Sequence, residues 1–302
     1  MKLFDLKRFA INDGPGIRTT LFLKGCPLHC IWCHNPEGIA PNAQKLYMEQ
    51  KCIGCQTCVD ECPQQALTLT AHGIQSDAER CTTCGRCTEV CPTLALEMAG
   101  REWSLEEVME AVEKERMVME TSGGGVTLCG GEPLMHPDDV CALFSELGRR
   151  GIHRALDTTL FCSPSTLERI LPICDLLLVD LKHMDSAQHE LYTGVPNEPI
   201  LDNLRRVSSA NARFWIRIPL IEGINADEDN LHATAQFLTR LPGTQPEQVC
   251  LLPYHDIGKG KHERLGTHYN PSGIRMETPS KEQQQAAINL LLSYGIPAKI
   301  GG

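Results

Sequence analysis

Apolar runs alternate along most of the chain with segments whose apolar residues recur at helical spacing. The run IRTTLFLKG, at 17–25, is rich in β-branched residues and predicts a buried strand. From residue 102 onward, strand and helix patterns follow one another as in a parallel sheet. Further strands are predicted in GVTLCGGEP, HRALDTT, DLLLVDLK, RFWIRIPLI and EQVCLLPYH, and PAKI near the end is a candidate for a short seventh.

The segments between these strands predict helices. SLEEVMEAVEKERMVM begins with Ser104 as an N-cap and has an acidic first turn. Similar helical patterns occur in HPDDVCALFSELGRRG, SPSTLERILPI, PILDNLRRVSSA, ADEDNLHATAQFLTRL and SKEQQQAAINLLLSYG. Repeated strand–helix units with right-handed crossovers form either a barrel or a doubly wound sheet, and the pattern alone favours neither.

Polar motifs stand where the predicted strands end. GCPLHC, GGEP, DTT, DLK and LLPYH each follow an apolar run. In both candidate architectures the side chains that do chemistry lie at the carboxyl ends of parallel strands. The sequence therefore predicts that these motifs meet in one functional site.

A duplicated segment interrupts the alternation. CIGCQTCVDECPQQAL begins at Cys52 and CTTCGRCTEVCPTLAL at Cys81, so four cysteines and a proline recur at one constant offset. The change in composition marks residues 45–98 as an insertion. The predicted organisation is residues 1–44 for the first strand and cysteine loop, 45–98 for the inserted module, and 99–302 for the rest of the α/β domain.

The duplicated segment has the spacing of bacterial two-cluster ferredoxins, in which the fourth cysteine of each run binds the other cluster. Zinc ribbons are the alternative, but they require neither the third cysteine nor the proline. The expected ligand sets are Cys52, Cys55, Cys58 and Cys91 for one cluster, and Cys81, Cys84, Cys87 and Cys62 for the other.

A separate triplet of cysteines, Cys26, Cys30 and Cys33, lies directly after the first predicted strand. A four-iron cluster needs one outer ligand for each iron, so three thiolates leave one iron open. The alternative is a zinc knuckle that takes His29 or His34 as its fourth ligand. The five other cysteines lack ligand spacing and are expected to be small buried hydrophobes, namely Cys129, Cys141, Cys162, Cys174 and Cys250.

Composition narrows the classes of protein that remain. The net charge is −10 over 302 residues, which gives no general basic surface for nucleic acid. The N-terminus has no apolar signal segment, and no run approaches the roughly 20 apolar residues that cross a bilayer. We therefore expect a cytoplasmic protein without membrane contact. In that reducing compartment its 16 cysteines are expected to be metal ligands rather than disulfides.

The motifs together resemble the radical S-adenosylmethionine (SAM) superfamily and, within it, the activating enzymes of glycyl radical enzymes. The resemblance is carried by DGPGIRTTLFLKGCPLHCIWCHNPEG, GGGVTLCGGEPLMHP, VDLKHMD and LLPYHDIGKGKH. The ferredoxin-like insertion points to the subgroup that serves dehydratases, decarboxylases and related lyases. The family implies an α/β fold, a partial (β/α)6 barrel with the two-cluster domain inserted.

The resemblance also implies an activity. SAM would chelate the open iron through its methionyl amine and carboxylate, and the reduced cluster would cleave it to methionine and a 5'-deoxyadenosyl radical. That radical would abstract hydrogen from a glycine Cα of the partner enzyme. Three 4Fe-4S clusters are expected in total, with reduced flavodoxin or ferredoxin as the electron donor.

Roles for the first motifs follow from the same resemblance. Trp32, His34 and Asn35 would flank the adenine, although Trp32 alone could equally belong to the core. Gly130 and Gly131, with Glu132 beside them, would bring backbone carbonyls against the ligand's ammonium, because a Cβ would block close approach. A plain turn between strand and helix is the alternative for these glycines.

The later motifs supply charged groups. Asp180 and Lys182 lie two residues apart, so their side chains share one face of a strand end, suited to ribose hydroxyls and a carboxylate. A surface ion pair is the alternative. His255 would reach the nucleoside or methionyl group, or be a structural histidine, and Arg217 would add charge near the carboxylate.

The segment DTTL, at 157–160, departs from the family pattern. Asp157 and Thr158 fit that pattern, but Leu160 stands where the family often has glycine, so the local turn is open to test. In related enzymes Asp157 and Asp180 would line a monovalent cation site.

Two other functions stay open, and a third is excluded. A dinucleotide fingerprint in DGPGIRT is rejected, because this segment precedes a strand rather than following one. The remaining rivals are a radical SAM enzyme that acts on a small molecule or peptide, and an iron–sulfur electron carrier without catalysis. The carrier is disfavoured because it needs no ligand site at strand ends.

Overall fold

A single large sheet organises the computed structural model, which describes all residues from 1 to 302. Its nine strands lie in the order β13-β12-β11-β10-β9-β8-β2-β1-β7, and the seven from β13 to β2 are parallel to their neighbours. These parallel strands are β2 (Arg18–Leu23), β8 (Gly125–Gly130), β9 (His153–Thr158), β10 (Leu176–Asp180), β11 (Phe214–Leu220), β12 (Val249–Pro253) and β13 (Ala298–Ile300).

These strands agree with the apolar runs, so the predicted α/β class with a parallel sheet is confirmed, and the short candidate at PAKI is a strand. Two strands at the other edge were missed, β1 (Lys2–Ala10) and β7 (Arg101–Glu102), and both pair antiparallel. β1 buries only Leu3 and Ala10, so its sequence carries little apolar signal.

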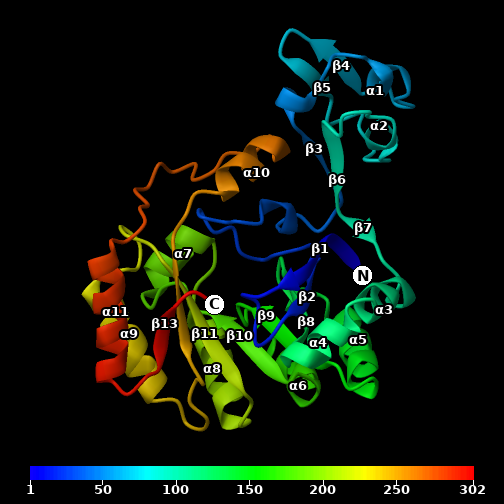
Figure 1. Cartoon of the computed structure of the whole chain (residues 1–302). Coiled ribbons are helices and arrows are strands. Elements are labelled where there is room, and N and C mark those ends of the chain that lie inside the picture. Colours follow the sequence, from blue (N-terminus) through cyan, green and yellow to red (C-terminus); the bar gives the residue numbers. More distant parts are fainter.

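The longer helices lie around the outside of the sheet, as Figure 1 shows, and their apolar faces join one core cluster of 38 buried residues. The pattern at 104–119 predicted one helix, but the structure has two. Ser104 caps the first with a capping box formed with Glu107, as its sequence indicates. The helices are α3 (Leu105–Glu113), α4 (Arg116–Ser122), α5 (Pro137–Arg149), α6 (Pro164–Ile170), α7 (Ser186–Thr193), α8 (Glu198–Ser209), α9 (Glu228–Thr239), α10 (Gly258–Leu265) and α11 (Lys281–Ser293).

Residues 44–99 form a lobe that projects from the sheet (Figure 1). Its base is the antiparallel pair of β3 (Gln44–Tyr47) and β6 (Leu96–Ala99). The rest of the lobe holds α1 (Thr57–Asp60), β4 (Leu67–Thr70), β5 (Gly73–Ser76) and α2 (Arg86–Glu89). It has its own small apolar cluster, which includes Cys58, Leu67, Ile74 and Leu96.

Four 3-10 turns complete the secondary structure. They are η1 (Pro36–Gly38), η2 (Glu49–Lys51), η3 (Pro133–Met135) and η4 (Leu171–Ile173). None of the helices combines the length and the hydropathy that a bilayer crossing requires.

Leu160 answers the question raised by the DTTL segment. Its φ is +62°, the left-handed region in which glycine is free of strain, so the backbone keeps the turn that a glycine would make. Its side chain is fully buried in the main core, and its carbonyl accepts a hydrogen bond from Asn203. Burial therefore offsets a backbone strain of about 1–2 kcal/mol.

This balance predicts an unusual order of stabilities. Leu160→Ala and Leu160→Gly should both lower the free energy of unfolding by about 2–5 kcal/mol, because both leave a cavity. Glycine also relieves the strain at positive φ, so Leu160→Gly should be at least as stable as Leu160→Ala. Anaerobic denaturation of the two variants measures this order. If Leu160→Gly is instead less stable than Leu160→Ala by about 1 kcal/mol, which is the usual difference where φ is negative, the measurement contradicts this account.

Candidate active site

One cavity of about 360 Å³ opens at the carboxyl ends of the parallel strands, where the sequence predicted the site. Every one of the five polar motifs contributes to its wall. The predicted residues that line it are Cys26, Cys30, Trp32, Cys33, His34, Asn35, Gly130, Gly131, Asp157, Asp180, Lys182, Arg217 and His255. Glu132 is the one predicted contact that does not line it.

The three-cysteine loop is held by backbone hydrogen bonds to separate elements. Cys26 donates to the carbonyl of Ile39 at 3.0 Å, and Ile31 donates to that of Tyr192 at 3.0 Å. Burial raises the pKa of the Cys26 thiol, and it raises that of Cys33 to about 12, with further increases from neighbouring thiols. Three adjacent buried thiols are poorly stable as free thiolates, whereas bound iron would stabilise that form.

The GGEP turn packs against this loop more closely than the sequence indicated. A Cβ on Gly131 would lie 2.0 Å from the carbonyl oxygen of Gly25, and one on Gly130 would lie 2.5 Å from the Leu23 nitrogen. The amide of Gly131 donates to the Leu23 carbonyl at 2.8 Å. These glycines are thus required by backbone packing, besides lining the cavity.

Glu132 points away from the cavity and is completely buried. Its carboxylate accepts from Thr158 Oγ1 at 2.6 Å, from both the amide and Oγ1 of Thr159, and from the Leu134 amide. Burial raises the pKa of Glu132, and these hydrogen bonds oppose the rise. Its position corrects the prediction of a ligand contact, because three of its four hydrogen bonds join the turn after β8 to the end of β9, and the fourth, from Leu134, closes that turn.

Charged side chains form another part of the cavity wall. Lys182 Nζ lies 2.8 Å from Asp180, and Arg217 Nη1 lies 2.9 Å from Asp157 and 3.9 Å from Asp13. Burial lowers the pKa of Lys182, but the Asp180 carboxylate raises it, and the result lies above the ordinary value. The pair is therefore a partly buried one inside the cavity rather than a surface ion pair.

Two features of this wall bear on ligand binding. Burial raises the pKa of Asp157. The negative charges of Asp180 and Asp13 raise it further, whereas the positive charge of Arg217 lowers it. Arg217 Nε is buried and has no hydrogen-bond partner in the protein. A buried donor without a partner costs free energy, so this wall lowers the stability of the fold in order to hold its charges.

Flat and aromatic groups form a third part of the wall. The imidazoles of His34 and His255 stack at 4.1 Å with 13° between their planes. Trp32 is 4% exposed and packs with Ile31, Ile221 and Ile224, so it is a core residue that also faces the cavity. These surfaces suit a planar base.

The cysteines of the lobe form two further groups around two small cavities. One cavity is lined by Cys52, Cys55, Cys58 and Cys91, and the other by Cys62, Cys81, Cys84 and Cys87. Each group joins three cysteines of one repeat to the last cysteine of the other, as the crossover spacing predicted. No group of three or more His, Cys, Asp or Glu side chains in the protein converges closely enough to hold a single metal ion.

Sequence reasoning missed several residues of the site. Asp13, Thr159 and Tyr254 line the cavity, and Lys261 contacts Asn35 from α10. Asp13 and Lys261 lie inside motifs that carry the family resemblance, but no local pattern indicates which way their side chains point.

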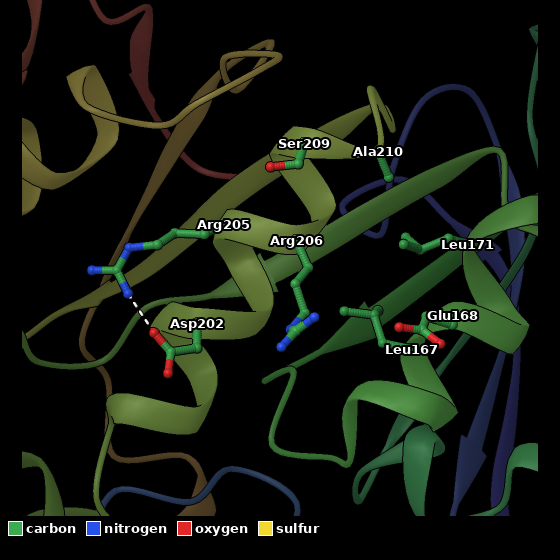
Figure 2. A pocket seen from close by; sticks show the side chains of 8 residues that line it. All are labelled: Leu167, Glu168, Leu171, Asp202, Arg205, Arg206, Ser209 and Ala210. Atoms are coloured by element: carbon green, nitrogen blue, oxygen red, sulfur yellow. Dashed lines mark hydrogen bonds and ion pairs between the residues drawn. The ribbon is translucent and has the colours of Figure 1, made fainter.

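A second hollow, of about 520 Å³, lies on the outer surface between α6 and α8 (Figure 2). Arg206 extends between the two helices toward Leu167 and Glu168, while Arg205 points away and pairs with Asp202. This hollow lies among the covering helices, whereas the predicted chemistry lies at the strand ends, so it is no part of the site.

Comparison with known families agrees with the site. The Radical SAM superfamily model matches residues 78–235, more than half of the chain, and a 4Fe-4S dicluster domain model matches residues 51–95. The trans-4-hydroxy-L-proline dehydratase activating enzyme of Clostridioides difficile is 40% identical over 99% of both chains. The protein belongs to the activating enzymes of glycyl radical enzymes.

Other relatives agree with this family. The benzylsuccinate synthase activating enzyme of Thauera aromatica is 39% identical, over 99% of this chain and 92% of its own. A domain of the pyruvate-formate lyase-activating enzyme from Bacteroides vulgatus has a similar crystal structure, with a TM-score of 0.52 and 48% identity, covering 59% of this chain and 99% of that one. This activating enzyme thus uses reductive cleavage of SAM to generate a glycyl radical in a partner protein, and the rival of a carrier without catalysis is wrong.

Glu132 offers a direct test of how the site is held. In this activating enzyme, Glu132→Gln should lower the free energy of unfolding by about 2–4 kcal/mol, because an amide cannot accept all four hydrogen bonds and leaves buried donors unpaired. Glu168→Gln, at an exposed position of α6, is the matched control and should change stability by at most about 0.5 kcal/mol. Equal effects of the two changes in thermal or denaturant unfolding would refute the assigned role.

Proposed function

We propose that Cys26, Cys30 and Cys33 bind the 4Fe-4S cluster that cleaves SAM, and that the cavity beside them binds the SAM molecule. One observation supports this most strongly: all five strand-end motifs and the three cysteines line the same cavity. When bound, the reduced cluster supplies the electron that splits SAM into methionine and a 5'-deoxyadenosyl radical.

The charged wall and the glycine turn would receive the methionyl end of SAM. The Arg217 guanidinium and Lys182 Nζ are cations suited to its carboxylate. Carbonyl groups at Gly130 and Gly131 would accept from its ammonium. The stacked His34 and His255, with Trp32 and Asn35, would then hold the adenine at the other end of the cavity.

The balance of charge in the cavity leaves room for a monovalent cation. Asp13, Asp157 and Asp180 line it together with only two cations, Lys182 and Arg217. With all five ionised, one negative charge is uncompensated. Asp157 already has Arg217 at 2.9 Å and Asp180 has Lys182 at 2.8 Å, so a monovalent cation beside Asp157 and Asp180 would offset the charge of the third carboxylate, Asp13.

We further propose that residues 45–98 are an inserted ferredoxin-like domain carrying two auxiliary clusters, and that residues 1–44 and 99–302 form a partial (β/α)6 barrel. Helices surround the sheet on its outer side, with the cavity at the strand ends, which favours the barrel over a doubly wound sheet (Figure 1). Reduced flavodoxin or ferredoxin would supply electrons. The partner is a glycyl radical enzyme.

Activation of a partner tests the proposal. The reduced, reconstituted protein should produce a glycyl doublet in paramagnetic resonance when it is mixed with SAM and a glycyl radical enzyme encoded nearby. Cys30→Ala should abolish both the doublet and SAM cleavage, and lower the iron content from about 12 to about 8 per chain. Cys141→Ala, outside the ligand sets, should change neither. SAM cleavage by Cys30→Ala, or zinc bound at the triplet, would refute the assignment.

The role of the lobe has a separate test. Cys58→Ala and Cys87→Ala should slow activation about tenfold or more with reduced flavodoxin as donor, and much less with a strong chemical reductant that reaches the buried cluster directly. The measurement is the rate of glycyl radical formation with each donor. Equal losses with both donors would instead indicate that the auxiliary clusters only stabilise the lobe.

A further inference from the structure

Helix α10 places Lys261 behind the wall of the SAM cavity. The first turn of the helix lies against the cysteine loop, because a Cβ on Gly258 would lie 2.5 Å from the carbonyl oxygen of Cys33. At its other end, Arg264 pairs with Glu97 of β6 at the base of the lobe. The helix is thus anchored at both ends, and the residue between these anchors is fixed in place.

Lys261 has two acceptors. Its Nζ lies 2.9 Å from Asn35 Oδ1 and 3.3 Å from Glu37 Oε1. The Glu37 side chain is 9% exposed, and its other carboxylate oxygen is buried without a partner, so Lys261 supplies the opposite charge that this carboxylate requires. These two acceptors, on residues 35 and 37, hold the Lys261 ammonium group next to the Asn35 amide.

This contact decides the orientation of the Asn35 amide. An ammonium has only donors, so the amide oxygen must face Lys261 and the NH₂ group is turned away from it. Asn35 lines the cavity beside Trp32, His34 and His255. The group that it offers to a ligand is therefore a hydrogen-bond donor, and the flat walls around it suit a planar heteroaromatic ring.

We propose that Lys261 is a positioning residue for nucleotide recognition: it orients Asn35 so that the amide NH₂ donates to an unprotonated ring nitrogen of the adenine. This inference rests on the proposed function, in which SAM fills the cavity. It adds a specificity rule, because a base that presents a donor or a C–H at that position would leave the NH₂ without an acceptor.

The test is equilibrium binding of SAM to the cluster-loaded protein in its oxidised state, which does not cleave the ligand. Lys261→Met should raise the dissociation constant about five- to tenfold, the size of one lost hydrogen bond. Lys261→Arg should retain most of the affinity, because it keeps the donors. Lys259→Met, at an exposed position on the same helix, is the matched control and should bind as the wild type does.

Analogues of SAM in which one adenine ring nitrogen is replaced by C–H make the test specific. The wild type should bind one of the N1, N3 and N7 analogues about tenfold more weakly than SAM, and Lys261→Met should not make this distinction. The inference is overturned if the wild type binds all three analogues as tightly as SAM, or if the loss persists unchanged in Lys261→Met.

Two more variants distinguish the amide contact of Lys261 from its ion pair. Glu37→Gln removes the ion pair but not the Asn35 contact, so it should bind SAM normally. A loss of SAM affinity equal to that of Lys261→Met would refute the amide argument.

If Lys261→Met does not fold, Asn35→Asp replaces it as the test. This change keeps an acceptor for Lys261 but removes the amide donor, so it should weaken SAM binding. Normal SAM binding by Asn35→Asp would overturn the inference alone, whereas failure of the wild type to bind SAM would overturn the proposed function.

Discussion

The close packing of two backbone segments, at Gly131 and at Gly25, is the constraint on which the site depends. No side chain fits between them, and the amide of Glu132 donates to the Gly25 carbonyl at 2.7 Å. This contact ties the loop after β2 to the turn after β8. Because the Glu132 carboxylate then binds Thr158 and Thr159, the ends of three successive parallel strands become one rigid unit.

Such rigidity matters because the cavity gathers groups that would otherwise repel one another or lose hydration. Asp157 and Asp180 are held beside Arg217 and Lys182, so each of these two partly buried carboxylates has a cation within 3 Å. Pairs of this kind contribute little net stability, because desolvation offsets their attraction. The main core of apolar residues behind the sheet therefore has to supply the stability that the polar site does not.

The last strand–helix unit closes the site from the other side. β12 leads into His255, which stacks on His34, and α10 then runs from the cysteine loop to the base of the lobe. The nucleotide end of the cavity and the attachment of the lobe thus share one helix. The chain enters and leaves the lobe through β3 and β6, and the Arg264–Glu97 pair adds an attachment to α10 at the same base.

Much of this protein was predictable because its signals are local. Apolar periodicity predicted the parallel strands and most helices, since it depends on residues near one another in the chain, and the crossover rule of two-cluster ferredoxins predicted which cysteines share a cavity. The same reasoning missed β1 and the break between α3 and α4. It also assigned Glu132 to the ligand, because a GGEP motif does not reveal on which side of a turn the carboxylate lies.

By itself, the sequence determined the α/β class, the position of the site at the strand ends and the family of the protein. Only the tertiary structure decided why Gly130 and Gly131 are glycines, how a leucine keeps the turn at position 160, and that Lys261 stands behind Asn35. These three facts depend on contacts between segments far apart in the chain. Asn35 and Lys261, for example, are separated by 226 positions in the sequence. Side-chain direction at such contacts is set by packing, which has no signature in a local stretch of sequence.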